Sequence, residues 1–391
     1  MAKYWRRIIG LILAFSLLFT LASGVAVATH FRQVEQVVKV ITLIRNQALY
    51  PVPTSKLLEG AAKGMVEALD DPYSSYLEPQ VFRSLEEHVK GTYGGVGLLI
   101  TIEEKEKERR LVVVSPFKGT PAHRAGILSG DYIVEIEGRP TSNMGLDTAA
   151  SLMQGQPGTQ VSLTIQRPGE KEVRRLTLTR EIIKIPSVTG EMLASAPGIG
   201  YISLTTFNDQ TGADLGRLLQ ELQKQGLKGI ILDLRNNPGG SLPAAVEVAS
   251  FFIPSGRPVV YIVNQKSTEA LTARGGSVDL PLVVLVNRGT ASAAEIVAGA
   301  VQDAGRGVLV GEKTFGKGVV QTIFRLNGGA AVKLTTHKYL TPAKRDIDQK
   351  GIEPDYKVSL DQRVAQQVLL HGPDLKQDLQ LQKAVELLKK K

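Results

Sequence analysis

The sequence lacks several residues and motifs on which large classes of protein function depend. Its 391 residues include no cysteine, which excludes disulfides, thiolate catalysis, zinc fingers and iron–sulfur clusters. The five histidines are scattered, and none forms the His-Glu-x-x-His pair of zinc hydrolases. The Gly-x-Ser-x-Gly motif of the common hydrolase triad is also absent. We therefore expect neither a metal ion nor a cofactor.

One segment imitates a phosphate-binding loop but departs from it at a decisive position. Residues 311–318 follow the loop pattern for seven positions, and then Gly318 stands where a Ser or Thr must bind magnesium. The residues that follow predict a strand, whereas a phosphate loop leads into the N-terminus of a helix. A nucleotide site is not expected here.

What the sequence does contain indicates a folded chain of more than one domain. It is 43% hydrophobic and 22% charged, which rules out wholesale disorder. Its length exceeds that of one ordinary domain. The formal net charge is +9, but charges of both signs are interspersed, so no nucleic-acid partner is predicted.

The first 28 residues predict a segment for export or membrane anchoring. Three basic residues precede an uncharged run from Ile8 to Ala28, and roughly 20 apolar residues can span a bilayer as a helix. The basic flank favours the cytoplasmic side, which places the chain after Thr29 outside. A cleaved signal peptide, with residues 26–28 as its cleavage site, is the alternative. Either reading predicts a protein anchored on the extracytoplasmic side of the bacterial membrane or exported to the periplasm.

Residues 29–90 predict helices, because apolar residues recur at spacings of three and four. Residues 70–76 interrupt this pattern, since Pro72 and its Asp and Ser neighbours favour a turn. No spacing typical of ligand binding occurs here, so the region is assigned a structural role.

Residues 91–180 predict a separate domain. Glycines at positions 94, 95 and 97 precede an apolar strand, residues 121–126 predict a short helix, and residues 130–138 predict an alternating strand and turn. These three elements in this order resemble a PDZ domain. The resemblance implies that main-chain N–H groups of the loop hold a peptide's C-terminal carboxylate while the next strand pairs with its backbone. The carboxylate-binding residues would be Gly95, Val96, Gly97 and Leu98.

Residues 181–360 alternate strand and helix patterns, which predicts an α/β core. The predicted strands are 199–204, 229–234, 259–263 and 282–286, and the predicted helices are 211–225, 242–250 and 291–304, with a hairpin turn at 327–329. Residues 374–391 predict a further helix on the surface, which we assign to packing rather than to chemistry.

The strongest candidate for chemistry is a serine that follows a buried strand and a glycine turn. Ser292 would begin an alanine-rich helix, and Glu295 would complete a capping box, which needs no function. However, the first turn of a helix also presents unpaired N–H groups that can cradle an oxyanion. Lys317 could serve as a base only if desolvation lowered its pKa from about 10.4 towards about 7. An ordinary surface lysine is the structural alternative.

Taken together, these segments resemble the carboxyl-terminal processing peptidases, also called tail-specific proteases. The matching motifs occur in the family order over nearly the whole chain after residue 28. They are residues 70–76, the PDZ-like unit, and residues 232–240, 289–295 and 316–321. The chain departs from its relatives at Ala294, where many carry a second serine.

The resemblance implies a multidomain α/β protein with a crotonase-like or ClpP-like protease core. The implied parts are a signal peptide or transmembrane anchor (1–28), a helical region (29–90), a PDZ domain (91–180), a serine protease core (181–360) and a C-terminal helical tail (361–391). It also implies catalytic roles. Ser292 would be the nucleophile, Lys317 the general base, and Gln321 the residue that orients the lysine amine. The N–H of Ala293, with that of Gly239 or of the glycine after it, would form the oxyanion hole.

Three functions remain compatible with the sequence. The first is a serine endopeptidase that cleaves proteins near or from their C-terminal tails through an acyl-enzyme, with the PDZ unit binding the tail. The second is a non-catalytic extracytoplasmic PDZ scaffold, in which Ser292 is only a helix cap. The third is acyl-group chemistry on a small molecule. The expected partners are proteins or peptides with exposed C-terminal tails and the membrane through the N-terminal segment, and a homo-oligomer is compatible with the sequence.

Overall fold

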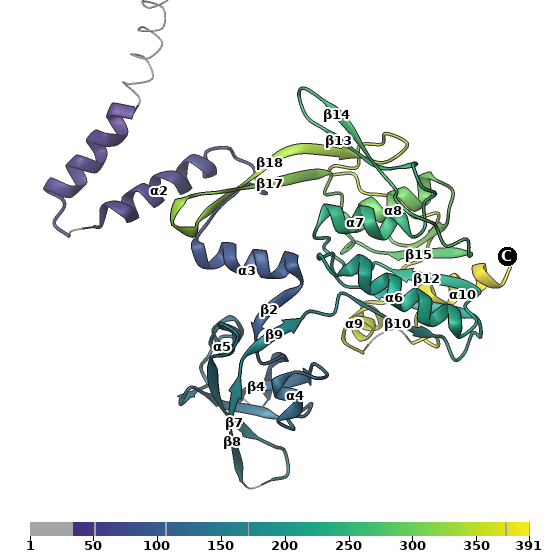
Figure 1. Ribbon diagram of the computed structural model, residues 1–391, viewed down its shortest axis with the longest axis horizontal. Helices are drawn as coiled ribbons and strands as arrows, with labels where there is room; N and C mark the ends of the chain where they lie inside the picture. Colours follow the sequence, from purple (N-terminus) through teal and green to yellow (C-terminus); the bar gives the residue numbers. More distant parts are fainter. Residues whose placement is uncertain (1–33, 51, 106–107, 171, 372–373, 391) are drawn as a thin grey trace, which may run out of the picture. The chain divides into compact units, whose positions relative to one another are not determined.

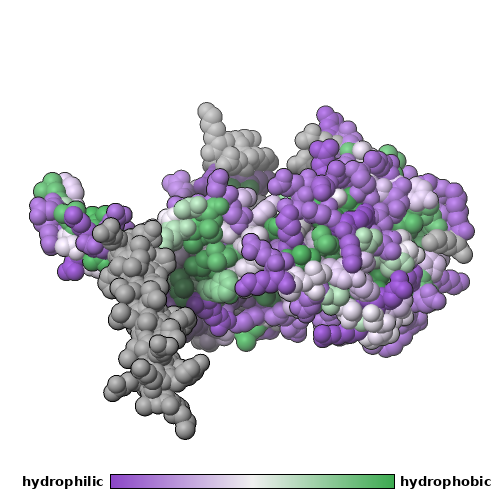
Figure 2. All heavy atoms as spheres, turned by 90° about the horizontal axis from the view of Figure 1, so that it is seen from above, coloured by the Kyte–Doolittle hydropathy of each residue, from purple (hydrophilic) through white to green (hydrophobic). Residues whose placement is uncertain are grey.

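The computed structural model of the chain describes residues 34–50, 52–105, 108–170, 172–371 and 374–390 (Figure 1). The segment expected to be an anchor or signal peptide, residues 8–28, lies outside these ranges. Within them, no helix combines the length and apolar character needed to cross a bilayer. The space-filling view shows a largely hydrophilic surface on which apolar side chains are exposed, some singly and some in groups (Figure 2).

The chain divides into two compact units, the first of which ends at Tyr76. It contains a helix over residues 34–47, helix α2 (Thr54–Glu67) and the start of a short strand, β1 (Ser75–Leu77). The predicted interruption at residues 70–76 is confirmed as a turn, in which the Asp71 carboxylate accepts hydrogen bonds from the Tyr73 N–H and the Ser74 hydroxyl.

The second unit begins with helix α3 (Pro79–Lys90) and continues into the PDZ-like unit. A small two-stranded sheet pairs β2 (Thr92–Gly95) with β9 (Glu181–Lys184). The residues that lie between these two strands in sequence form a separate antiparallel sheet with its own apolar core. Its elements are β3 (Leu98–Lys105), β4 (Glu108–Pro116), α4 (Pro121–Arg124), β5 (Tyr132–Ile136), β6 (Arg139–Pro140), α5 (Leu146–Met153), β7 (Gln160–Gln166) and β8 (Val173–Thr179). The predicted short helix and alternating strand are thus confirmed as α4 and β5.

A buried ion pair ties the PDZ-like unit together at the start of β5. The Asp131 side chain is 1% exposed and lies 2.8 Å from the Arg167 guanidinium. Burial works against ionisation of Asp131, but its hydrogen bonds with Arg167 and with the Leu128 N–H, and the charge of Arg167, hold the pKa of the carboxyl below its ordinary value of 3.8. The pair therefore stabilises the fold only while Asp131 is ionised.

We expect Asp131→Asn to lower the free energy of unfolding by about 2 kcal/mol at pH 7, because a charged hydrogen-bonded pair is lost. Since the folded carboxyl has the lower pKa, its contribution is present above the unfolded value of 3.8 and disappears as the pH falls through the folded value. Urea unfolding of both proteins, followed by circular dichroism from pH 7 down to pH 2, should show the difference shrinking in acid. A difference that stays constant over that range would contradict this assignment.

The larger core is built on a six-stranded sheet in the order β10-β11-β12-β15-β16-β19, in which only β10 runs antiparallel to its neighbour. Its strands are β10 (Val188–Met192), β11 (Ile199–Leu204), β12 (Gly229–Asp233), β15 (Leu282–Val286), β16 (Val308–Gly311) and β19 (Tyr356–Lys357). Alternate residues of the central strands enter two different cores. Ile230 and Leu232 pack with α6 (Thr211–Lys224), α7 (Leu242–Ser250) and α8 (Ala293–Asp303), whereas Ile231 packs with α10 (Leu379–Lys389). The central sheet is therefore covered on both faces, as continuous apolar strands require.

A second sheet contains β14 (Thr268–Thr272), β13 (Pro258–Val263), β18 (Ala331–Leu340) and β17 (Val319–Arg325) in neighbouring positions. The two last form a long hairpin (Figure 1). Its turn, the short helix η1 (Asn327–Gly329), is where the sequence predicted it. Helix α9 (Gln362–His371) precedes α10 near the C-terminus.

The predicted helices and buried strands of the core are confirmed, with α8 beginning at Ala293 rather than at residue 291. The sequence did not predict β10, β14, β16 and β19. Strands β10 and β14 are partly polar and exposed, and β16 and β19 are short, so none of them gives a clear alternating pattern.

Candidate active site

Ser292 stands at the N-cap of α8, directly after the turn that follows strand β15. Its backbone has φ 54° and ψ −118°, a conformation that costs energy for a residue with a side chain. Hydrogen bonds on both sides hold it there. The Ala291 N–H donates to the Asn237 carbonyl at 2.9 Å, and the Ser292 N–H donates to Glu295 Oε2 at 2.9 Å. Strain maintained by such contacts is typical of functional positions.

The Glu295 carboxylate connects the segments that carry two of the predicted catalytic residues, Ser292 and Lys317. It is fully buried and accepts from Ser292 N–H and Lys317 N–H through Oε2, each at 2.9 Å. Through Oε1 it accepts from Gly316 N–H at 2.8 Å and from the Thr314 hydroxyl at 2.6 Å. The sequence predicted Glu295 as part of a capping box, and the structure confirms that contact while adding three donors from a loop about 20 residues away. One carboxylate therefore fixes the main chain beside both Ser292 and Lys317.

Tyr339, on strand β18, contacts the main-chain carbonyl groups of both Ser292 and Lys317. Its hydroxyl is 3.2 Å from the Ser292 carbonyl and also donates to the Lys317 carbonyl. The ring is almost completely buried, at 1% exposure. No sequence pattern indicated this residue, because its role depends on the folding of a distant strand against the site.

The loop that carries Lys317 needs glycine on both sides of the lysine. Gly316 has φ 92°, and a Cβ there would lie 2.7 Å from the Gly351 nitrogen. A Cβ on Gly318 would lie 2.6 Å from the Asp348 nitrogen. The Gly318 N–H also donates to Asp348 Oδ1 at 3.0 Å. This close backbone approach leaves Lys317 partly buried, whereas a lysine on a free surface loop would be exposed.

Gln321 follows Lys317 on strand β17, where the pairing with β18 is irregular between Val320 and Gln321. Its side-chain amide donates to the Thr335 hydroxyl at 3.4 Å. The amide is therefore held on the strand that follows the lysine loop, and Thr335 on β18 is a further residue of this region that sequence reasoning missed.

The glycine turn that the sequence predicted as an oxyanion hole lies against Ser292. A Cβ on Gly239 would lie 2.8 Å from both the Ser292 Cβ and the Ala293 nitrogen, so only glycine fits. Its N–H donates to Asn237 Oδ1 at 2.8 Å. Gly240 contacts a different partner, because a Cβ there would lie 2.1 Å from the Phe207 carbonyl oxygen. Of the two glycines, Gly239 is thus the one in contact with Ser292.

The PDZ-like unit has a small cavity at its predicted carboxylate-binding loop. Val96, Gly97 and Leu98 line a cavity of about 40 Å³ together with residues of α5, while Gly95 lies outside the lining. Gly97 has φ 79°, and a Cβ there would lie 2.4 Å from the Thr120 side chain. Tyr93 also lines the cavity, and burial raises the pKa of its hydroxyl to about 12, so it stays neutral and able to donate.

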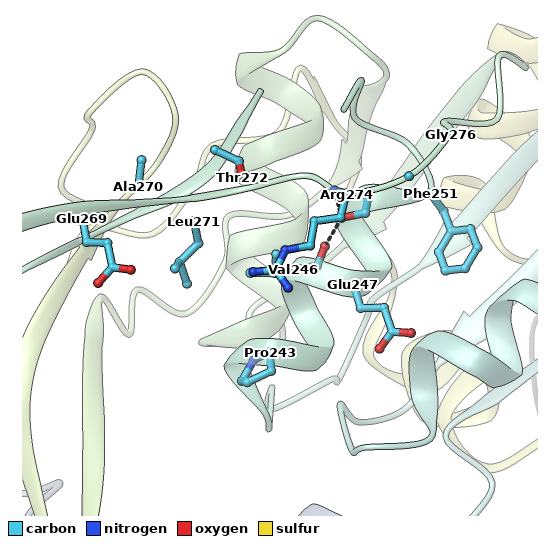
Figure 3. A pocket seen from close by; sticks show the side chains of 12 residues that line it. Pro243, Val246, Glu247, Phe251, Glu269, Ala270, Leu271, Thr272, Arg274 and Gly276 are labelled. Carbon is cyan, nitrogen blue, oxygen red and sulfur yellow. Dashed lines mark hydrogen bonds between the residues drawn. The ribbon is translucent and has the colours of Figure 1, made fainter. Parts of the chain in front are cut away.

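A larger groove, of about 520 Å³, lies between helix α7 and the edge strand β14 (Figure 3). The Arg274 side chain extends between strand and helix (Figure 3), and the main-chain N–H of Arg274 donates to the Ser250 hydroxyl at 2.9 Å. None of the predicted catalytic residues lines this groove. Within the described residues, no group of three or more histidine and acidic side chains could hold a metal ion.

Comparison with known families assigns the class of protein. Residues 198–358 match peptidase family S41, residues 112–167 match a PDZ domain, and residues 21–81 match the N-terminal domain of the activating protease CtpB. A putative S41 protease from Bacteroides fragilis shares the fold, with a TM-score of 0.56 at 17% identity over 90% of this chain and 97% of that one.

The sequence relatives define the family more closely. The chain is 41% identical to the carboxyl-terminal-processing protease of Synechocystis, over 84% of this chain and 76% of that protein. It is 38% identical to the carboxy-terminal processing protease CtpA of Bacillus subtilis, over 81% of this chain and 67% of that protein. The chain belongs to the carboxyl-terminal processing proteases, which are serine proteases of family S41.

Proposed function

We propose that this protein is an endopeptidase that cleaves polypeptides near their C-terminal tails with Ser292 as nucleophile and Lys317 as general base. The observation that carries the proposal is the double connection between these residues. Glu295 binds both N–H groups, and Tyr339 contacts both carbonyls. An ordinary helix cap needs neither the second loop nor the tyrosine.

In this mechanism, the neutral Lys317 amine takes the Ser292 proton as the hydroxyl oxygen attacks the scissile carbonyl. The ammonium then protonates the leaving amine, the C–N bond breaks, and an acyl-enzyme remains. Water, deprotonated by the same amine, attacks the ester and releases the N-terminal fragment as the acid. Gln321 would orient the amine during both halves.

The oxyanion hole would consist of the Ala293 and Gly239 N–H groups, which lie next to Ser292. The Gly239 donor is engaged by Asn237 in this structure. Catalysis through it therefore requires the substrate oxygen to replace Asn237 Oδ1.

The remaining parts of the proposal, on domain roles and location, rest on the sequence. The protease core (181–360) would have a crotonase-like or ClpP-like architecture, and the PDZ domain (91–180) would bind the substrate's C-terminal carboxylate through Gly95–Leu98. The N-terminal segment, as anchor or signal peptide, would place the enzyme outside the cytoplasm, where it could act as a homo-oligomer.

A pair of substrates tests this function. An unfolded polypeptide with a free C-terminal carboxylate should be cleaved by residues 29–391, and the same polypeptide with a C-terminal amide should show a KM raised about tenfold or more. The reason is that the loop N–H groups lose a charged acceptor, and hydrogen bonds to charged groups contribute about 1.5–3 kcal/mol. Cleavage products are measured by mass spectrometry. Binding of the free tail without any cleavage would favour the non-catalytic scaffold function. Equal KM values would show that the protein does not recognise the C-terminal carboxylate.

A further inference from the structure

We propose that Asp378, at the start of the C-terminal helix α10, is a positioning residue for the oxyanion turn and acts through Arg235. This inference rests on the proposed function, because it concerns the glycine turn beside Ser292. The sequence assigned the C-terminal helix to packing alone. The structure shows that its first residues contact a buried arginine that immediately precedes the turn.

Arg235 lies between two carboxylates from distant parts of the chain. Its Nη2 donates to Asp233 Oδ2 at 2.6 Å, and its Nη1 donates to Asp378 Oδ2 at 2.8 Å and to Gln380 Oε1 at 3.0 Å. The side chains of Arg235 and Asp378 are 3% and 0% exposed. Tyr201 completes the cluster by donating to Asp233 Oδ2 at 2.6 Å.

The cluster keeps the guanidinium charged despite its burial. Desolvation alone would lower the pKa of Arg235, but the charge and hydrogen bonds of Asp233, followed by the charge of Asp378, hold that pKa above its ordinary value. Without the Asp378 charge, Arg235 keeps its ion pair with Asp233, but its Nη1 loses a charged acceptor, which weakens the constraint on the position of the guanidinium. The position of Arg235 therefore depends on Asp378 as well as on its sequence neighbour.

A displacement of Arg235 would be transmitted to the catalytic region, because only a few residues separate Arg235 from the glycine turn. Asn236 follows with φ 57°, and Asn237 then makes three contacts that define the turn. Its carbonyl accepts from the Ala291 N–H, its Oδ1 accepts from the Gly239 N–H, and its Nδ2 donates to the Leu204 carbonyl. The first two of these contacts connect the turn to the residue before Ser292 and to the predicted oxyanion donor.

Asp378 is suited to this task because its two oxygens have separate roles. Oδ1 caps α10 by accepting from the Gln380 and Leu381 N–H groups, each at 3.0 Å, and Oδ2 accepts from Arg235. Helix α10 packs on the sheet face opposite α7 and α8. The C-terminal segment thus supports the turn from the opposite face of the sheet, although Asp378 and Arg235 are 143 residues apart in sequence.

The test compares Asp378→Asn with Leu388→Ala in the full-length protein. Asp378→Asn retains an oxygen to cap the helix but removes the charge. Leu388→Ala loosens the same helix, where Leu388 packs in the core against the sheet, without touching Arg235. We expect Asp378→Asn to lower kcat about 10- to 100-fold with KM little changed. Its affinity for a peptide aldehyde of the substrate sequence should fall by a similar factor, because the adduct places an oxyanion in the hole. Thermal unfolding gives the stability of each variant.

Leu388→Ala should lose stability with kcat close to that of the parent. Equal losses of kcat in the two variants at equal loss of stability, or a normal kcat in Asp378→Asn, would overturn the proposal. If Asp378→Asn does not fold, Gln380→Met is used instead; it removes one acceptor of Arg235, together with the amide donor to the Val358 carbonyl. It should lower kcat by a smaller factor, and an unchanged kcat would then count against the proposal. The parent chain is assayed first, because a parent that cleaves nothing refutes the proposed function rather than the role of Asp378.

Discussion

Lys317→Ala should abolish peptide cleavage, with kcat/KM reduced at least about 1,000-fold while the fold is retained. Removal of the amine leaves the Ser292 hydroxyl without a base, and a neutral hydroxyl attacks an amide poorly. The fold should survive because the contacts that hold this loop are made by the main chain of Lys317 and its neighbours, which the substitution leaves in place. Activity is measured on an unfolded protein substrate, and the fold is checked by circular dichroism.

Lys317→Arg is the matched control for this prediction. It keeps a long, positively charged side chain, but a guanidinium cannot give up its proton at neutral pH. If the lysine acts as a base, the arginine variant should be as inactive as the alanine variant. Appreciable cleavage by Lys317→Arg would mean that the residue contributes only charge, and normal cleavage by Lys317→Ala would eliminate the dyad.

Glu295→Gln should reduce kcat about 100-fold, although the residue touches no substrate in the proposed mechanism. The glutamine amide can accept at one end only, so its NH2 group faces donors that Glu295 now satisfies. A buried donor without a partner costs about 1–3 kcal/mol. The main chain at Ser292 or at Lys317 must therefore shift, and shifts of about 1 Å at reacting groups can cost about 100-fold in rate.

Glu353→Gln is the control for the effect of removing a carboxylate near the same loop. Glu353 forms exposed ion pairs with Lys313 and Lys357, and exposed pairs of this kind contribute little. Steady-state kinetics of both variants should show normal turnover in Glu353→Gln and a large loss in Glu295→Gln. Full activity in Glu295→Gln would show that the four contacts serve the helix cap and loop alone.

The parts of the fold that the sequence predicted are those with strong local patterns. The largely apolar strands β12 and β15 and the amphipathic helix α6 were evident from periodicity and glycine boundaries. Strand β14 was not, because Thr268, Glu269 and Ala270 are exposed on a sheet edge and carry no apolar alternation. Pairing with β13, which no local pattern records, determines that segment.

The candidate site divides in the same way. Ser292, Lys317 and the glycine turn could be found because each stands in a short motif. The roles of Tyr339 and Asp378 could not, because each depends on a contact between segments far apart in sequence, 47 residues for Tyr339 and Ser292 and 143 for Asp378 and Arg235. The C-terminal helix shows the difference most clearly. Its leucine pattern correctly predicted packing, but Asp378 and Gln380 at its start are buried and bonded to Arg235.

The central claim is that Ser292 becomes covalently attached to the substrate, and mass spectrometry of an acid-quenched reaction tests it most directly. Trypsin releases residues 289–306 as one peptide, which contains Ser292. During turnover, that peptide should gain the mass of the N-terminal substrate fragment less one water relative to the free acid, with fragmentation placing the addition on Ser292. The Ser292→Ala protein should show no addition. An adduct on another residue, or cleavage by the Ser292→Ala protein at the parent rate, would contradict the account.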